Sequence, residues 1–378
     1  MFSCQKVVSD FFSSAGINLG GDAPHDIKVH DPRFYRRFLS AGNLGLGESY
    51  MDGWWDSPQL EKVFEKLYGS QAILSVKMKE YRTIAAAIYS KIVPEGSMER
   101  SHEIARAHYS LDNDLFQKML DPRMAYSCGV WHFGAKNLLE AQEDKLELIC
   151  RKLHLKSGMK VLDVGCGWGS FAKYAAEKYG VEVVGITVSD AQADLAREMC
   201  KDLPVTIEVQ DYRKMTGQFD RVVSIAMFEA VGKRYMNTFL DQMKSLLKDD
   251  GIFFLHTIGF FDDEFKASPW LDKYIFPGSY VPIYGELATS LQDRFVVEHF
   301  ENIGAGYAPT LHAWYDNFVA VWPTIKDRYD ERFYRMWVYY LLMCEATFKH
   351  RLSHVWHFVM RKHDTLGVYH FETPKQRS

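Results

Sequence analysis

A glycine-spaced turn follows an apolar run at residues 161–169, which read VLDVGCGWG. The run predicts a buried parallel strand, and a helical pattern begins near Phe171. Glycines at positions 165 and 167 would let the backbone turn tightly and come close to a ligand. This arrangement is typical of a nucleotide-type cofactor held at the carboxyl end of a first parallel strand.

The next strand helps to choose between cofactors. A dinucleotide site has an acid there, about 20 residues beyond the glycines, whereas this chain offers Thr187 and Ser189, followed by Gln192. The glycine spacing also departs from Gly-x-Gly-x-x-Gly. Both points favour S-adenosylmethionine over NAD, and the motif resembles the first motif of class I methyltransferases. The exit of the third strand, at Gln210, Asp211 and Tyr212, stands where those enzymes hold the adenine.

Two further groups with catalytic potential follow later strands. Glu229 comes after the predicted fourth strand and His256 lies at the end of the fifth. Because the carboxyl ends of parallel strands gather at one crevice, we expect these two side chains to converge near the cofactor. A segment before the sheet, Tyr126 to Trp131, carries Ser127 and Cys128 and belongs to the same candidate site.

The elements that must position these residues alternate along the chain. Apolar periodicity predicts helices over 137–153, 170–179, 190–201 and 235–247, the third capped by Ser189. It predicts strands over 160–164, 181–188, 205–209, 219–226 and 251–258. Strands that alternate with helices through short connections indicate an α/β fold with a doubly wound, mostly parallel sheet.

The ends of the chain have a different pattern. Residues 1–95 read as a smaller N-terminal domain with a glycine- and aromatic-rich loop at 42–55 and helices at 60–67 and 73–92; a linker at 94–97 would separate it from a catalytic domain over 96–378. A helical stretch over 327–363 is mildly basic. Its basic residues fit a solvated helix face or, alternatively, a contact with anionic lipid headgroups.

Composition restricts the class of protein. The chain has 378 residues, more than one comfortable core, so two domains are expected. A net charge of −4 gives no reason to expect nucleic acid as a partner. The six cysteines form no metal-binding pattern, so we expect no metal site and a reducing compartment. No apolar stretch reaches the length of a membrane span, and we expect no signal peptide.

Several motifs taken together resemble one family, the bacterial cyclopropane-fatty-acyl-phospholipid synthases, and more distantly the mycolic acid cyclopropane synthases. The resemblance runs from about residue 20 to the end. The motifs that carry it are LGLGESYMDGWW (44–55), HYSLDNDLF (108–116), YSCGVW (126–131), VLDVGCGWGS (161–170), FLHTIG (254–259), DKYIFPG (272–278) and AWYDNF (313–318).

The resemblance implies a class I methyltransferase-like fold and a reaction that adds a methylene from S-adenosylmethionine across a cis double bond of a phospholipid acyl chain. It implies a carbocation intermediate that is deprotonated by bound bicarbonate. The residues implied to hold bicarbonate are Cys128, Glu229, His256, the backbone at Ile258, and Tyr315. Those implied to hold the cofactor are Tyr126, Ser127, Gly165, Gly167, Thr187, Gln192 and the turn of Gln210, Asp211 and Tyr212.

Chemistry supports these residue types. A cation in an apolar pocket is stabilised by aromatic faces and nearby negative charge, and a small anion needs converging donors such as His256 and Tyr315. Glu229 cannot donate unless it is protonated, so we expect it either to orient His256 or to share a proton with the anion.

The sequence departs from the family pattern at two positions. Ala230 stands where relatives usually have histidine, and Val130 where they usually have an aromatic residue. Two other functions therefore stay open: a methyltransferase that makes a methyl-branched lipid or a methylated small metabolite, and a non-catalytic lipid-binding protein. The resemblance further implies a cytoplasmic protein held peripherally at the inner face of the membrane, at a phospholipid bilayer surface, and a possible homodimer.

Overall fold

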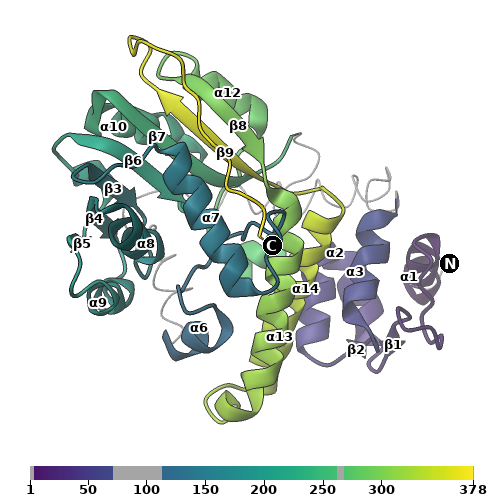
Figure 1. The fold of residues 1–378 in the computed structure, drawn as a ribbon. Helices are drawn as coiled ribbons and strands as arrows, with labels where there is room; N and C mark the ends of the chain where they lie inside the picture. The colour runs from purple at the N-terminus through teal and green to yellow at the C-terminus, as the bar shows by residue number, and fades with distance from the viewer. Residues whose placement is uncertain (1–3, 71–112, 262–267, 378) are drawn as a thin grey trace. The chain divides into compact units, whose positions relative to one another are not determined.

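The computed structural model describes residues 4–70, 113–261 and 268–377 (Figure 1). Packing divides these residues into two units. The first consists of the described residues within Met1–Pro94, Lys266–Pro277 and Trp314–Leu352, and the second of those within Glu95–Phe265, Gly278–Ala313 and Ser353–Ser378. The described parts of Lys266–Pro277 and Trp314–Leu352 thus belong with the N-terminal helices, so a single boundary in the sequence does not separate the two units. The predicted boundary near residue 95 and the predicted helix at 73–92 lie outside the described residues.

The second unit is built on a seven-stranded sheet with strand order β5-β4-β3-β6-β7-β9-β8. Its strands are β3 (Lys160–Val164), β4 (Glu182–Thr187), β5 (Val205–Val209), β6 (Phe219–Ile225), β7 (Leu247–Gly259), β8 (Val296–Asn302) and β9 (His354–Arg361). β3 to β7 are parallel to their neighbours, whereas β9 pairs antiparallel with both β7 and β8. The predicted mostly parallel, doubly wound sheet is confirmed.

The helices of this unit are α6 (Asn113–Met119), α7 (Leu138–Lys152), α8 (Ser170–Tyr179), α9 (Asp190–Met199), α10 (Met236–Leu246) and α12 (Tyr284–Leu291), together with the start of α13 (Tyr307–Ile325). Short 3-10 turns lie at η1 (Tyr212–Lys214), η2 (Phe228–Ala230), η3 (Lys233–Tyr235) and η4 (Gly304–Gly306). The helices predicted over 137–153, 170–179, 190–201 and 235–247 correspond to α7, α8, α9 and α10, and Ser189 caps α9 by accepting from the Gln192 N–H.

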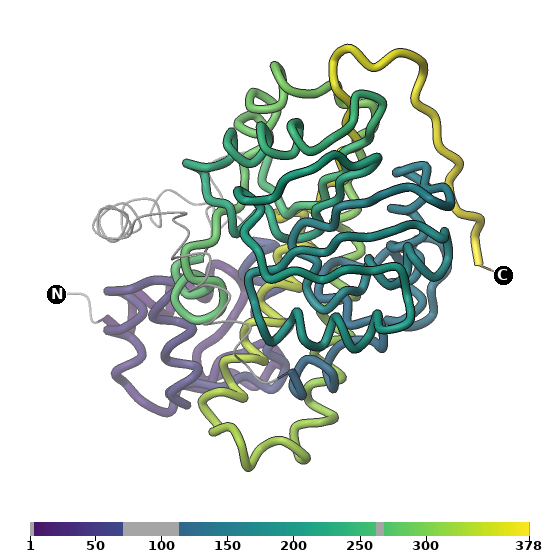
Figure 2. The backbone as a smooth tube through the Cα atoms, turned by 90° about the vertical axis from the view of Figure 1, so that its left-hand side faces the viewer, coloured from purple at the N-terminus to yellow at the C-terminus, as the bar shows by residue number. Residues whose placement is uncertain are grey.

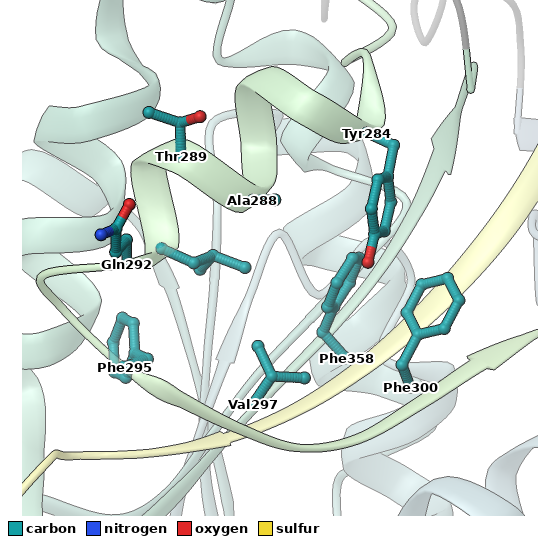
Figure 3. A pocket seen from close by; sticks show the side chains of 9 residues that line it. Tyr284, Ala288, Thr289, Gln292, Phe295, Val297, Phe300 and Phe358 are labelled. Atoms are coloured by element: carbon teal, nitrogen blue, oxygen red, sulfur yellow. The ribbon is translucent and has the colours of Figure 1, made fainter.

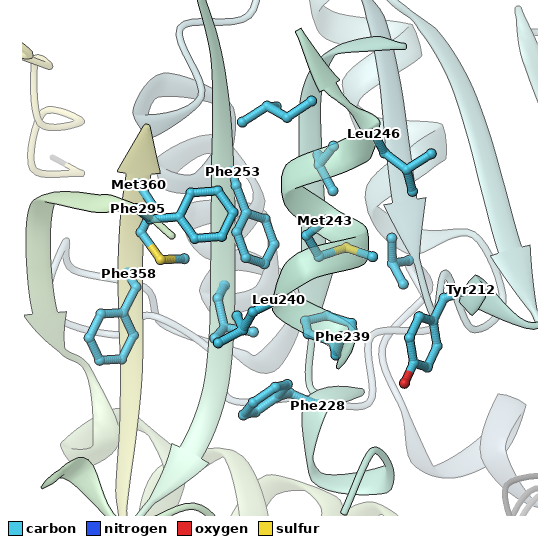
Figure 4. Packing of buried hydrophobic residues seen from close by; sticks show 14 of the residues in the cluster. Tyr212, Phe228, Phe239, Leu240, Met243, Leu246, Phe253, Phe295, Phe358 and Met360 are labelled. Atoms are coloured by element: carbon cyan, nitrogen blue, oxygen red, sulfur yellow. The ribbon is translucent and has the colours of Figure 1, made fainter. Parts of the chain in front are cut away.

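Alternating strand residues form two cores, one on each face of the sheet. Phe253 and Leu255 of β7 join α10 and α12 on one face (Figure 4). Ile252 and Phe254 join α7 and α8 on the other. Since both faces are covered, the five central strands are buried through most of their length, as parallel strands between helices must be, whereas the edge strands β5 and β8 are partly exposed.

The C-terminal segment after β9 lies against α7 (Figure 2). The Tyr369 hydroxyl donates to the Lys152 carbonyl at 2.8 Å, and the Arg377 guanidinium pairs with Asp144 at 2.9 Å.

The helix predicted over 327–363 is only partly right. α14 spans Glu331–Lys349, Arg351 then takes a positive φ of 57°, and β9 follows. β9 reads HVWHFVMR, a buried run rich in β-branched and aromatic residues, which favours a strand.

The first unit contains α1 (Cys4–Ser14), α2 (Arg33–Met51), α3 (Leu60–Gly69), α11 (Pro269–Tyr274), α14 and the later part of α13, with a small antiparallel pair of β1 (Lys28–Val29) and β2 (Trp55–Asp56). α14 packs on α2 and α3. The predicted helix at 60–67 is confirmed as α3. The predicted loop at 42–55 is wrong, because α2 continues to Met51.

Close packing explains the glycines that suggested a loop. A Cβ at Gly47 would lie 2.5 Å from the indole of Trp270, so only glycine lets α2 approach α11 this closely. Gly42 alone has non-helical angles and kinks the helix. Among the described residues no helix is long and apolar enough to cross a membrane.

Candidate active site

The glycine turn after β3 has the geometry of a ligand cradle. Gly165 and Gly167 have φ values of +80° and +54°. A Cβ at Gly165 would lie 2.4 Å from Cγ of Met227, whereas one at Gly167 would meet nothing within 4 Å. Gly165 is therefore required by packing, and Gly167 leaves open space at the start of α8, where backbone N–H groups favour polar or anionic ligand groups.

The polar residues predicted to surround a cofactor occupy the ends of the next two strands. The Thr187 hydroxyl donates to Oε1 of Gln192 at 2.9 Å. Asp211 pairs with Arg213 at 2.6 Å and caps η1, and Gln210 contacts Sδ of Met215. These residues are held by their neighbours in positions from which they could contact a ligand.

Tyr212 has a different environment from the residues beside it. Its ring lies in the core between the sheet and α10, at 5.1 Å from Phe239 (Figure 4). This packing accounts for its aromatic character without a ligand, and its predicted contact with the adenine stays a prediction.

The segment before the sheet is anchored to α7 by a buried lysine that the sequence analysis did not identify. Lys145 Nζ donates to Oγ of Ser127 at 2.7 Å and to Oε1 of Gln142 at 2.6 Å. The lysine is buried, and desolvation lowers its pKa to about 8. Tyr126 lies next to Ser127, with its ring 5.3 Å from Phe116.

Cys128 is a buried neutral thiol. Its Sγ lies 3.3 Å from the Gly129 carbonyl and 3.7 Å from the Ile303 carbonyl, and burial raises the pKa of the thiol. A thiol with a raised pKa is a poor nucleophile, so Cys128 is suited to donate a hydrogen bond. Its neighbour Val130 is also buried, and the Val130 N–H donates to the Ala141 carbonyl.

Glu229 lies on η2, which follows β6 through a sharp change of direction. Ala226 has a positive φ of 53°, a strained conformation for a residue that is not glycine. The turn brings Oε1 of Glu229 to 2.6 Å from the N–H of Ile258 on β7. Burial raises the pKa of Glu229 to about 6, while the bond from Ile258 opposes that shift.

The same contacts bear on two predictions. The amide of Ile258, predicted to hold an anion, already donates to Glu229, so its role in this structure is to hold that carboxylate. The Tyr280 N–H also donates to the backbone carbonyl of Glu229 at 2.7 Å. Glu229 is thus fixed by these two groups despite the alanine at position 230.

His256 lies on β7 directly opposite His357 of β9. Its Nδ1 is 2.9 Å from Nε2 of His357, whose Nδ1 is 3.1 Å from Nζ of Lys152. All three side chains are fully buried. The partner that orients His256 is therefore His357, not Glu229, which corrects one of the two roles expected for the carboxylate.

The sequence analysis missed Lys145, Lys152 and His357 as site residues. His357 was missed because its segment was predicted as helix. The two lysines are seven residues apart on α7, so they lie on one helix face, and that face is buried. Lysines at this spacing within an apolar stripe were a signal that could have been used.

Buried polar atoms at or near the carboxyl ends of β3, β6 and β7 have no hydrogen-bond partner among the described residues. They include Oδ2 of Asp163, Oγ of Ser224, Oε2 of Glu229 and Nε2 of His256. Each unpaired buried group costs about 1–3 kcal/mol. Such atoms next to a glycine cradle fit a site that is completed by polar ligands.

Tyr315 lies on the part of α13 that belongs to the first unit, whereas the other predicted anion-binding residues belong to the second. The Tyr315 side chain is half-buried, and burial raises the pKa of its phenol. Its predicted place beside Cys128, Glu229 and His256 stays a prediction.

A groove elsewhere in the second unit contains none of the predicted residues. It is lined by apolar side chains of α12, β8 and β9, among them Tyr284, Phe295 and Phe300 (Figure 3). The candidate active site is therefore assigned from its chemistry, not from the size of a cavity.

Residues 96–358 match the family model described as mycolic acid cyclopropane synthetase. The chain is 45% identical over 359 residues to the cyclopropane-fatty-acyl-phospholipid synthase of Escherichia coli K12, covering 94% of this chain and 93% of that protein.

Two solved structures are also similar. The cyclopropane synthase MmaA2 of Mycobacterium tuberculosis has a TM-score of 0.66 at 28% identity, over 69% of this chain and 98% of that one. The mycolic acid cyclopropane synthase CmaA1, complexed with SAH and CTAB, has a TM-score of 0.65 at 30% identity, over 69% of this chain and 98% of that one.

Proposed function

The chain belongs to the mycolic acid cyclopropane synthetase family, and we propose that it transfers a methylene from S-adenosylmethionine to the cis double bond of unsaturated phospholipid acyl chains. The observation that carries this proposal is the pair of unpaired buried atoms on Glu229 and His256, close to the ends of β6 and β7. The match to the Escherichia coli synthase over almost the whole of both chains supports the lipid substrate.

S-adenosylmethionine supplies an electrophilic methyl group when it is bound. The glycine turn, Thr187 and Gln192 would hold it at the ends of β3 and β4. The CmaA1 structure was obtained with SAH, which supports the assignment. A methyl group on a sulfonium would be open to attack by the alkene, with the thioether as leaving group, and the positive charge would pass to the acyl chain. Loss of a proton from the added methyl then closes the ring.

Bound bicarbonate would supply the proton acceptor for that last step. The residues present fit a small anion that carries a proton: an N–H at His256 Nε2 would donate to it, and the carboxylate of Glu229 would accept from its hydroxyl. The Cys128 thiol would offer a further donor on turning away from the carbonyls of Gly129 and Ile303, which it contacts here. Buried surroundings strengthen these interactions and exclude water, which would otherwise trap the cation as an alcohol.

The product decides whether this function is right. The full chain is incubated with vesicles of unsaturated phospholipid and a donor labelled in its methyl group, and the lipids are analysed by mass spectrometry and NMR. We expect a gain of one methylene and cyclopropane resonances. A methyl-branched lipid, a labelled polar metabolite, or cofactor binding without turnover would each contradict the proposal.

The role of bicarbonate has a separate test. Buffers freed of carbon dioxide should lower turnover, and added bicarbonate should restore it, with sodium chloride at equal ionic strength as the control. Turnover that is indifferent to bicarbonate would contradict the assignment of the proton acceptor while leaving the lipid reaction intact.

The bilayer surface is the proposed site of action, since the acyl chain must reach the enzyme from the membrane. Exposed basic residues of the stretch 326–362, such as Lys326 and Arg351, would contact anionic headgroups, whereas Arg335 and Arg361 are largely buried in ion pairs. Sedimentation should show binding to anionic vesicles that weakens with salt. Equal binding to zwitterionic and anionic vesicles would contradict a role for these charges. Light scattering of the protein without vesicles would measure its mass and so test the possible homodimer.

A further inference from the structure

A row of four polar side chains leads from the surface to the unpaired nitrogen of His256. Glu301 of β8 is opposite His357 of β9, which is opposite His256 of β7, so three adjacent strands contribute one residue each. Lys152 of α7 forms an ion pair with Glu301 and approaches Nδ1 of His357. Only Glu301 has an exposed side chain, at 29%.

The charge of Lys152 sets the direction of the hydrogen bonds from Lys152 to His357 and from His357 to His256. A lysine ammonium has three donors and no acceptor. Burial lowers the pKa of Lys152, but the ion pair with the carboxylate of Glu301 opposes that shift and favours the charged form. Nδ1 of His357 must then accept from Lys152, which leaves the ring proton on Nε2. That N–H donates to Nδ1 of His256, so the ring proton of His256 is also on Nε2.

We propose that Lys152 and His357 are positioning residues that fix His256 as the tautomer with its proton on Nε2. His256 then presents an N–H donor, and not a lone pair, to the anion of the reaction; this reaction role rests on the proposed function, whereas the tautomer does not. Both ring nitrogens are accounted for, because the lone pair of Nδ1 accepts from His357 and Nε2 carries the hydrogen. His256 therefore binds the proton acceptor and is not itself the base.

The surroundings of the row keep the two imidazoles neutral, as this scheme needs. Burial lowers the pKa of His256 and of His357, and the positive charges of Lys145 and Lys152 act in the same direction. The edge-on contact of His357 with Phe254, at 4.8 Å, holds its ring in place. A neutral imidazole whose Nδ1 accepts a hydrogen bond must carry its proton on Nε2.

The tautomer can be measured directly in the ligand-free full chain. Histidine is labelled with nitrogen-15, and the signals of His256 among the 14 histidines are identified by their loss in His256→Gln. Long-range proton–nitrogen correlation distinguishes a protonated Nε2 from a protonated Nδ1. We expect Nε2–H. A protonated Nδ1 in the wild type would overturn the proposal.

Variants test the cause. Lys152→Met should produce mixed tautomers at His256 and reduce turnover about tenfold, the effect of one lost charge-assisted hydrogen bond. Lys248→Met is the matched control, since Lys248 pairs with Asp220 at the other end of β7. An unchanged tautomer and turnover in Lys152→Met would overturn the proposal.

If Lys152→Met does not fold, two variants of His357 test whether this residue fixes the tautomer of His256. His357→Gln can still accept from Lys152 and donate to His256, so it should keep the tautomer and most of the turnover. His357→Leu should lose both, and identical His256 signals in the two variants would contradict the proposal. A correct tautomer in a protein that makes no cyclopropane lipid would refute the proposed function alone.

Discussion

Glu229 has two oxygens in different environments, and this difference defines its role. Oε1 accepts from Ile258 and holds the side chain, while Oε2 is buried without a partner among the described residues. The first oxygen gives orientation and the second is free for chemistry. A carboxylate with a pKa raised to about 6 can exchange a proton near neutral pH.

Replacing Glu229 with glutamine tests this division. The amide oxygen can still accept from Ile258, but an NH2 group replaces the free acceptor. We expect turnover to fall about 100-fold and the dissociation constant of S-adenosylmethionine to change less than about threefold. Steady-state kinetics and calorimetry measure the two quantities.

Glu177→Gln is the matched control, because Glu177 is a partly exposed carboxylate that pairs with Arg123. It should affect neither quantity. Equal losses of turnover and affinity in Glu229→Gln would mean that Glu229 supports the cofactor, against our assignment.

Asp163 predicts how stability depends on pH in the ligand-free protein. Desolvation raises its pKa from 3.8 to about 7. The folded state then binds the proton more tightly than the unfolded state, so this group makes the free energy of unfolding fall as pH rises from about 4 to about 7. The contribution is on the order of 1–4 kcal/mol. Asp163→Asn should flatten that slope in denaturant titrations.

Asp220→Asn provides the opposite case. Desolvation raises the pKa of Asp220, but the bonds from Lys248 and from the Lys160 N–H lower it by more, so the net pKa lies below its usual value. This carboxylate therefore stabilises the fold at pH values above its usual pKa. Its loss should leave the fall in stability between pH 4 and 7 in place. A slope unchanged by Asp163→Asn would refute the assigned cause.

Among the helices and strands, those with a regular apolar repeat could be predicted from the sequence. α7 to α10 and β3 to β7 were found because their apolar residues repeat at the helix or strand period, and Glu229 and His256 were placed because parallel strand ends converge. β8 was missed because its sequence, VVEHFEN, mixes apolar and charged residues and contains no buried residue. β9 was missed because its apolar run begins soon after the apolar helix α14 ends. The missed strand β9 carries His357, so the partner of His256 was missed with it.

The turn after β3 gives a prediction for an element. Gly165→Ala places a methyl group against Met227 at a positive φ, so it should destabilise the protein by about 1–3 kcal/mol and weaken cofactor binding at least tenfold. Thermal unfolding and calorimetry measure the two effects.

Gly217→Ala is the control, because Gly217 has a φ of +107° but its Cβ would meet only Phe219, at 3.8 Å. It should cost stability without affecting cofactor affinity. Wild-type cofactor affinity in Gly165→Ala would show that the turn does not hold the ligand.

For the whole molecule, the first unit is assembled from segments far apart in the sequence. Tyr339 of α14 lies 4.9 Å from Phe64 and 5.7 Å from Tyr50. Arg335 donates to the Trp55 carbonyl and pairs with Asp56. Composition and local pattern cannot show such pairing, because it depends on contacts between residues about 280 positions apart.

A fragment that begins at residue 113 should therefore not fold normally. It keeps α14 but loses α2 and α3, which leaves Tyr339 without the rings of Tyr50 and Phe64 that cover it. We expect aggregation or strong binding of a hydrophobic dye, compared with the full chain in size-exclusion chromatography and fluorescence. A monodisperse fragment with native stability would contradict the described packing.

The most direct test of the reaction uses S-adenosylmethionine with a fully deuterated methyl group. The enzyme acts on vesicles of unsaturated phospholipid, and mass spectrometry counts the deuterium retained in each modified acyl chain. Ring closure by loss of a proton from the transferred methyl predicts two deuterium atoms in the product. Three retained atoms would mean that the methyl group is transferred whole, and the account of Glu229, His256 and the proton acceptor would be wrong.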